Sequence, residues 1–68
     1  MLRWLKKLVY LVLGGSLYTV KQGDTLSTIA MHHYGDGNRY PEIFDANTDL
    51  LDNPNKIYPG QVLIIPRK

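Results

Sequence analysis

The sequence predicts a small α+β domain with the element order β-α-α-β. Three observations predict it. Residues 18–21 alternate between apolar and polar side chains, which is the period of a half-buried strand. Residues 25–34 and 39–46 place apolar side chains at helical spacing, and residues 61–65 form a short apolar run rich in β-branched side chains. Because two strands alone are marginally stable in water, we expect them to pair antiparallel and to be covered by the two helices.

Length and composition limit the classes of protein that this chain can represent. Its 68 residues suit a single domain near the lower size limit for a self-sufficient core. Cysteine is absent, which excludes disulfides and thiolate metal sites. The net charge is only +2, and the basic residues lie mainly at the two ends of the chain. This distribution argues against nucleic acid as the main partner.

The first strand leads through a turn into the first predicted helix. Gly23 breaks the strand and allows backbone angles that a side chain would oppose. Asp24 or Thr25 can then accept a hydrogen bond from the free N–H groups at the start of a helix over residues 25–34. Gly35 follows as a left-handed cap residue. One face of this helix carries Leu26, Ile29, Ala30, His33 and Tyr34.

The second predicted helix spans residues 39–46, after a turn at residues 36–38. Asn38 is the expected N-cap, and Pro41 is tolerated because it falls in the first turn. The spacing i, i+3, i+4 and i+7 predicts an inward face made of Tyr40, Ile43, Phe44 and Asn47.

A polar loop over residues 47–55 precedes the closing strand. Tyr58-Pro59-Gly60 is a strong turn signal, with proline at the second position and glycine taking a positive φ at the third. Pro66 ends the strand, since it lacks the ladder donor. The predicted core consists of Val20, Leu26, Ile29, Ala30, Tyr34, Ile43, Phe44, Val62 and Ile64.

Residues 1–13 form a separate compositional unit. If they are helical, Arg3, Lys6, Lys7 and Tyr10 share one face and the rest is apolar, which suits a membrane surface or a hydrophobic groove. The alternatives are a signal peptide, an element that packs against protein and an engineered appendage. The apolar run within residues 1–13 is too short to span a bilayer. The change of composition at Gly14-Gly15-Ser16, taken as a flexible hinge, divides the chain into residues 1–16 and a domain of residues 17–68.

Two half-motifs resemble those of the lysin motif, or LysM, family. The first is Tyr18-Thr19-Val20-Lys21-x-Gly23-Asp24-Thr25-Leu26-x-x-Ile29-Ala30, and the second is Ile57-x-Pro59-Gly60-Gln61-x-Leu63-x-Ile65-Pro66. Asn47 resembles the asparagine that ends the family's second helix. The resemblance covers residues 18–66 and says nothing of residues 1–13.

The resemblance implies a βααβ fold and non-catalytic binding of glycans that contain N-acetylglucosamine (GlcNAc), in peptidoglycan or chitin. The family's groove lies between the loop after the first strand and the loop before the second. Carried over to this chain, the glycan-binding residues are Gly23, Asp24, Thr25 and Leu26 on one side and Asn55, Lys56, Ile57 and Tyr58 on the other. The implied location is the bacterial cell envelope or the secreted fraction.

Two stretches are longer than in the shortest LysM pattern, namely residues 34–40 and 49–56. They resemble a subgroup found in small bacterial cytoplasmic proteins and in phage-tail or contractile-injection baseplates, where such modules dock proteins or respond to ions. The alternative function is therefore protein docking in a membrane-associated or tail-like assembly, through residues 1–13 in particular, with a virion or cytoplasmic location. A cation-responsive module is a third possibility.

Catalytic and metal sites are not expected. His32 and His33 are adjacent, so on a helix they point about 100° apart and do not share one ion. The six acidic residues suit caps, turns and solvation better than the paired carboxylates of a glycosidase, which need a cleft. The loop over residues 49–55 lacks the spaced acidic pattern of a calcium loop. We therefore predict a binding protein, not an enzyme, with no cofactor and no metal.

Overall fold

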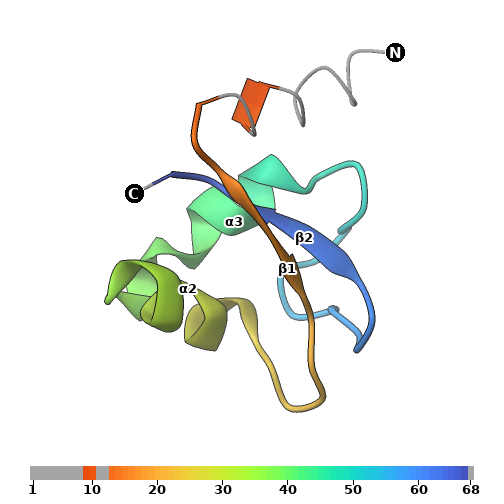
Figure 1. Cartoon of the computed structure of the whole chain (residues 1–68). Coiled ribbons are helices and arrows are strands. Elements are labelled where there is room, and N and C mark those ends of the chain that lie inside the picture. Colours follow the sequence, from red (N-terminus) through yellow and green to blue (C-terminus); the bar gives the residue numbers. More distant parts are fainter. Residues whose placement is uncertain (1–8, 11–12, 68) are drawn as a thin grey trace.

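The computed structural model describes residues 9–10 and 13–67, and its element order is the predicted βααβ (Figure 1). Strand β1 (Ser16–Thr19) leads to helix α2 (Leu26–Tyr34), and a short 3-10 helix η1 (Gly37–Arg39) leads directly into helix α3 (Tyr40–Ala46). Strand β2 (Val62–Ile65) closes the domain and pairs antiparallel with β1. Both helices cover one face of this two-stranded sheet (Figure 1).

The register of the sheet decides which side chains reach the core. Tyr18 lies opposite Leu63, and Thr19 lies opposite Val62. Side chains alternate between the two faces of a strand, so Leu63 and Ile65 face the helices and Val62 faces outward. Leu63 is fully buried, whereas Val62 is 48% exposed. The prediction that Val62 belongs to the core was wrong, because the strand faces the helices with the opposite set of side chains.

The core joins residues from both strands, from helices α2 and α3 and from the connecting loops. Its buried cluster comprises Val20, Leu26, Ile29, Ala30, Ile43, Leu51, Leu63 and Ile65, with Tyr18, Tyr34, Phe44 and Ile57 packed partly buried against it. Ile64 is also buried, although it lies outside this cluster. The predicted core is thus largely confirmed, and Leu51 joins it from the polar loop.

Helix α2 begins and ends as the sequence predicts. The Thr25 side chain accepts a hydrogen bond from the Thr28 N–H at 3.1 Å, and the Thr28 side chain accepts one from the Thr25 N–H at 3.0 Å. This reciprocal pair resolves the choice of N-cap in favour of Thr25. Gly35 adopts the expected left-handed conformation, with φ of 75°, and its N–H donates to the Met31 carbonyl.

Helix α3 starts differently from the prediction. Asn38 lies inside η1, and its N–H donates to the Asp36 side chain at 2.9 Å, so Asp36 caps the 3-10 turn. No side chain caps α3 itself, because η1 continues directly into it. The expected N-cap role of Asn38 was therefore wrong. Tyr40, expected inside, is 39% exposed, since it sits where the 3-10 turn changes the angle between successive side chains.

Asn47 ties the end of α3 to the outer edge of β2. Its side chain is buried, and Nδ2 donates to the Ile43 carbonyl at 2.7 Å and to the Ile64 carbonyl at 2.9 Å. Its Oδ1 accepts from the Ile64 N–H at 2.9 Å. The amide therefore pairs both backbone groups of Ile64, as a neighbouring strand would.

The link before β1 is a turn with a defined backbone. The Leu13 N–H donates to the Val9 carbonyl at 3.0 Å, and the Gly15 N–H donates to the Tyr10 carbonyl at 2.8 Å. Gly14 has φ of 100° between them, which is the pattern of a glycine-terminated helix end. The predictions for residues 1–13 otherwise lie mostly outside the described residues. Within the part that is described, no helix has the length and apolar character to span a membrane.

Candidate functional site

The two loops of the expected groove meet at Val20, immediately after β1. The Val20 N–H donates to the Gln61 carbonyl at 2.8 Å, and the Gly60 N–H donates to the Val20 carbonyl at 2.9 Å. Val20 therefore bonds two successive residues of the facing segment, Gly60 and Gln61, which is the pattern of a β-bulge. These bonds bring the segment after β1 beside the segment before β2, although forty residues separate them in the sequence.

A tight turn holds Tyr58 at the surface. The Gln61 N–H donates to the Tyr58 carbonyl at 3.2 Å, and the Gln61 side chain accepts from the Tyr58 N–H at 2.8 Å. Gly60 has φ of 92°, as expected for the third position of a type II turn that has proline at the second. Tyr58 is 60% exposed, so its ring is available to a ligand.

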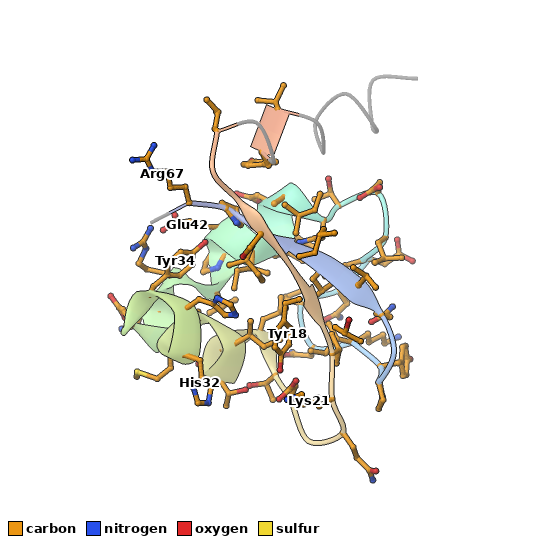
Figure 2. All side chains as sticks on the ribbon, in the orientation of Figure 1. Tyr18, Lys21, His32, Tyr34, Glu42 and Arg67 are labelled. Atoms are coloured by element: carbon orange, nitrogen blue, oxygen red, sulfur yellow. The ribbon has the colours of Figure 1, made fainter. Side chains whose placement is uncertain are left out.

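Asp24 fixes the loop between β1 and α2. One carboxylate oxygen accepts from the Tyr18 hydroxyl at 2.5 Å and from the Lys21 N–H at 2.8 Å. The hydrogen bond from Tyr18 and, after it, the bond from the Lys21 N–H hold the pKa of Asp24 below its ordinary value. The Tyr18–Asp24 hydrogen bond also raises the pKa of Tyr18. Figure 2 shows Tyr18 directed toward this loop, on which Lys21 also lies. The Asp24 carboxylate therefore fixes the conformation of the loop to which it belongs.

The start of α2 presents free backbone donors. The capping pair satisfies the N–H groups of Thr25 and Thr28. Within the described part of the chain, the N–H groups of Leu26 and Ser27 have no hydrogen-bond acceptor, as is usual for the first turn of a helix. Of the two residues only Ser27 is exposed, so its N–H is the one that can donate to a carbonyl oxygen of a ligand.

The predicted site residues divide by exposure. Gly23, Thr25, Asn55, Lys56 and Tyr58 are exposed, and Asp24 and Ile57 are half-buried. Leu26 is only 2% exposed, and its side chain packs in the core. A ligand at this surface would therefore not contact Leu26, and the apolar contact expected from its side chain would have to come from Ile57 and Tyr58.

Sequence reasoning missed two supporting side chains. Tyr18 orients Asp24 across six residues, and Gln61 holds the Tyr58 backbone. The signal for Gln61 was present, since a side chain can accept from a nearby N–H in a turn. The Tyr18 contact depends on the path of the intervening loop, which the spacing alone does not give.

The two histidines differ in their surroundings. His32 is exposed, whereas His33 is half-buried with its ring edge-on to Tyr18 at 5.5 Å between centroids. Among the described residues, no group of three acidic, histidine or cysteine side chains is arranged to hold a metal ion.

Comparison with known proteins identifies the family. The LysM domain model matches residues 18–66. A potassium binding protein, Kbp, of Escherichia coli is 59% identical over 51 residues, which cover 75% of this chain and 34% of Kbp. An uncharacterized protein of Deinococcus radiodurans is 51% identical over 53 residues, or 78% of this chain and 20% of that protein. Esterase Rv1288 of Mycobacterium tuberculosis is 48% identical over 48 residues, or 71% of this chain and 10% of the esterase.

The shared region covers between 10% and 34% of the length of each of these relatives. It coincides with the βααβ unit, both half-motifs and the two loops that meet at Val20. The chain belongs to the LysM family.

Proposed function

We propose that this domain binds a GlcNAc-containing cell-wall glycan, of peptidoglycan or chitin type, without catalysis. The meeting of the two loops at Val20 carries the proposal, because it places free backbone donors and an exposed aromatic ring on adjacent segments. The N–H group of Ser27, which is exposed, can donate to an N-acetyl carbonyl, and the exposed ring of Tyr58 can cover an apolar sugar face. Gly23 leaves open space in which a sugar can approach the backbone.

Binding without catalysis is consistent with how the shared region is distributed. The matching segment makes up a tenth of esterase Rv1288 and a third of Kbp, so one small module recurs in proteins of different kinds. A single sugar site of this size binds weakly, and several copies would add avidity. The corresponding location that we propose is the bacterial cell envelope or the secreted fraction.

A titration of the isotope-labelled chain with GlcNAc oligomers and with soluble peptidoglycan fragments tests the proposal residue by residue. We expect saturable NMR shifts focused on residues 23–27 and 55–58. A chain that shows no shifts at millimolar ligand, or shifts spread evenly over the surface, would refute glycan binding at these loops.

Tyr58→Ala gives a sharper test, because the exposed ring contributes little to the fold. Loss of the aromatic contact should weaken glycan binding by about 5- to 20-fold, equivalent to about 1–2 kcal/mol. The free energy of unfolding should change by less than about 0.5 kcal/mol. Tyr40→Ala is the matched control, since Tyr40 is also exposed but lies at the start of α3. Equal losses of affinity in both variants would contradict the role of Tyr58.

A potassium-responsive module is the second candidate, and the 59% identity to a potassium binding protein favours it. Potassium is coordinated by oxygen atoms, and the polar loop at residues 47–55 is rich in them. The same labelled sample, titrated with KCl against NaCl at equal ionic strength, distinguishes this function. Saturable shifts specific to K⁺ would support it, and identical responses to both salts would exclude it.

A protein-docking module in a membrane-associated or tail-like assembly is the remaining proposal from the sequence. Its partner surface would be residues 1–13, which are apolar and basic. Cosedimentation of the chain with anionic lipid vesicles, compared with a chain that begins at Ser16, would test the membrane form of this idea. Equal sedimentation of both chains would contradict it.

A further inference from the structure

A groove lies at the opposite end of the sheet from the glycan loops. The glycan loops adjoin the Thr19–Val62 end of the sheet, whereas this groove adjoins the Ser16–Ile65 end. Its volume is about 300 Å³, the lower end of the range of small-molecule sites. Its walls are formed by Ser16, His33, Tyr34, Ile65, Pro66 and Arg67.

Specific contacts hold the walls of the groove in place. The Tyr34 hydroxyl donates to the Pro66 carbonyl at 2.6 Å, which joins the end of α2 to the end of β2. The Arg39 guanidinium stacks over the Tyr34 ring at 4.0 Å from its centroid. The His33 ring meets Tyr18 edge-on, with an angle of 81° between the rings. A ligand would therefore enter a formed site, without first ordering these aromatic walls.

Three hydrogen-bond donors line the groove, and no carboxylate does. The lining residues that carry them are Ser16 with its hydroxyl, His33 with its imidazole and Arg67 with its guanidinium. Within the described part of the chain, neither the Ser16 hydroxyl nor the Arg67 guanidinium has a hydrogen-bond or ion-pair partner. Both residues are exposed, so water can satisfy these donors and a ligand carboxylate can replace that water.

The nearby acid Glu42 is already neutralised. Its two carboxylate oxygens accept from the Arg39 guanidinium at 2.7 and 2.9 Å, as a two-pronged ion pair. Figure 2 shows Glu42, Tyr34 and Arg67 at the same end of the molecule. Because Arg39 pairs with Glu42, the positive charge of Arg67 remains available to an anion.

Gly14 leaves room for the Arg67 stem. A Cβ atom at Gly14 would lie 3.1 Å from Arg67 Cδ, and its φ of 100° disfavours any side chain. The aliphatic part of Arg67 therefore lies over the glycine backbone beside the groove, with its charged group in solvent.

We propose that this groove binds the carboxylate of a small ligand with an apolar body, such as the C-terminus of a short peptide. The Arg67 guanidinium donates to the two carboxylate oxygens as a fork, and the Ser16 hydroxyl and His33 imidazole donate to the same group. Ile65, Pro66 and the Tyr34 ring contact the apolar body. This site is independent of the glycan loops, so either can exist without the other.

The test is an NMR titration of the full chain with N-acetyl-alanyl-alanine, with the same dipeptide as its C-terminal amide, and with sodium acetate. We expect the free acid to shift the signals of Ser16, His33 and Arg67 in a saturable way. The amide lacks the charge and acetate lacks the apolar body, so both should bind at least tenfold more weakly. Equal binding of acid and amide would overturn carboxylate recognition, and equal binding of acid and acetate would overturn the apolar contact.

Arg67→Gln should weaken binding of the free acid about tenfold, the effect of losing about 1.4 kcal/mol of charge-assisted hydrogen bonding. Lys56→Gln is the matched control, because it removes one exposed positive charge at the other end of the molecule. It should change the affinity less than twofold. Both positions are exposed, so the spectra outside the substituted positions should be preserved. Equal losses in the two variants would show a nonspecific charge effect and overturn the site.

Discussion

Replacement of Asn47 by alanine should remove most of the stability of the domain. The side chain is 1% exposed and makes three hydrogen bonds, at 2.7, 2.9 and 2.9 Å, to the backbone of Ile43 and Ile64. Asn47→Ala leaves the N–H and C=O of the buried Ile64 without these partners. Each unpaired buried group lowers the free energy of unfolding by about 1–3 kcal/mol. The total expected loss is about 3–5 kcal/mol.

This loss is large for a domain of 68 residues, whose whole stability is about 3–10 kcal/mol at the usual value per residue. Urea unfolding followed by circular dichroism measures the change directly, and added sucrose extends the range if the variant is partly unfolded without urea. Asn38→Ala is the control, since Asn38 is exposed and its N–H, not its side chain, makes the local bond.

The control variant should lose less than about 0.5 kcal/mol. A loss below about 1 kcal/mol for Asn47→Ala would refute the reasoning, because it would mean that water or a shifted backbone replaces the buried amide. A loss near 1 kcal/mol for Asn38→Ala would restore that residue as the N-cap of a helix, against the geometry described above.

Three further predictions concern the core, the cap and the loop. Leu63→Ala should cost about 2–5 kcal/mol in urea unfolding, while Val62→Ala should cost less than about 1 kcal/mol, and similar costs would contradict the observed strand face. Thr25→Ala should cost about 1 kcal/mol through loss of the α2 cap, and Thr25→Ser should recover most of it; no difference between the two would argue against the cap. The hydrogen bond from the Tyr18 hydroxyl is the main reason why the pKa of Asp24 is lower in the folded chain than in the unfolded chain. The ionised Asp24 therefore stabilises the fold above the ordinary carboxyl pKa, and this stabilisation is lost as the pH falls through the pKa of Asp24 in the folded chain. Asp24→Asn should therefore flatten the decline of the urea midpoint between neutral pH and about pH 2, and an unchanged acid profile would contradict this account.

Local signals predicted both ends of α2 and the turn before β2 well, whereas the first strand, predicted from residues 18–21, lies at Ser16–Thr19. The Thr25 cap, the left-handed Gly35 and the turn at Pro59-Gly60 each depend on bonds between residues at most four positions apart. Such bonds follow from residue type and spacing, so the sequence carries them. The start of α3 was predicted less well, because Asp36 and Asn38 are both good capping residues and only the 3-10 geometry distinguishes them.

The candidate glycan site was predicted as a list of residues but not as an arrangement. The family resemblance supplied both loops, and the fold brings them together through Val20. Exposure could not be read from residue type: Leu26 and Ile57 are both apolar, yet the first is buried and the second is half-buried. Each outcome depends on how the helix start and the loop pack on the sheet.

The sequence alone determined the family, the order of elements and the local caps and turns, because these follow from short-range spacing and from the two half-motifs. The tertiary structure alone decided the face of β2, the Asn47 bridge and the groove beside Tyr34. All four residues of β2 are apolar, so no alternation in the sequence indicates which face is buried; the pairing with β1 and the bulge at Gly60 decide it. The Asn47 and Tyr34 contacts join residues 17 and 32 positions apart, and such contacts exist only once the chain has closed on itself.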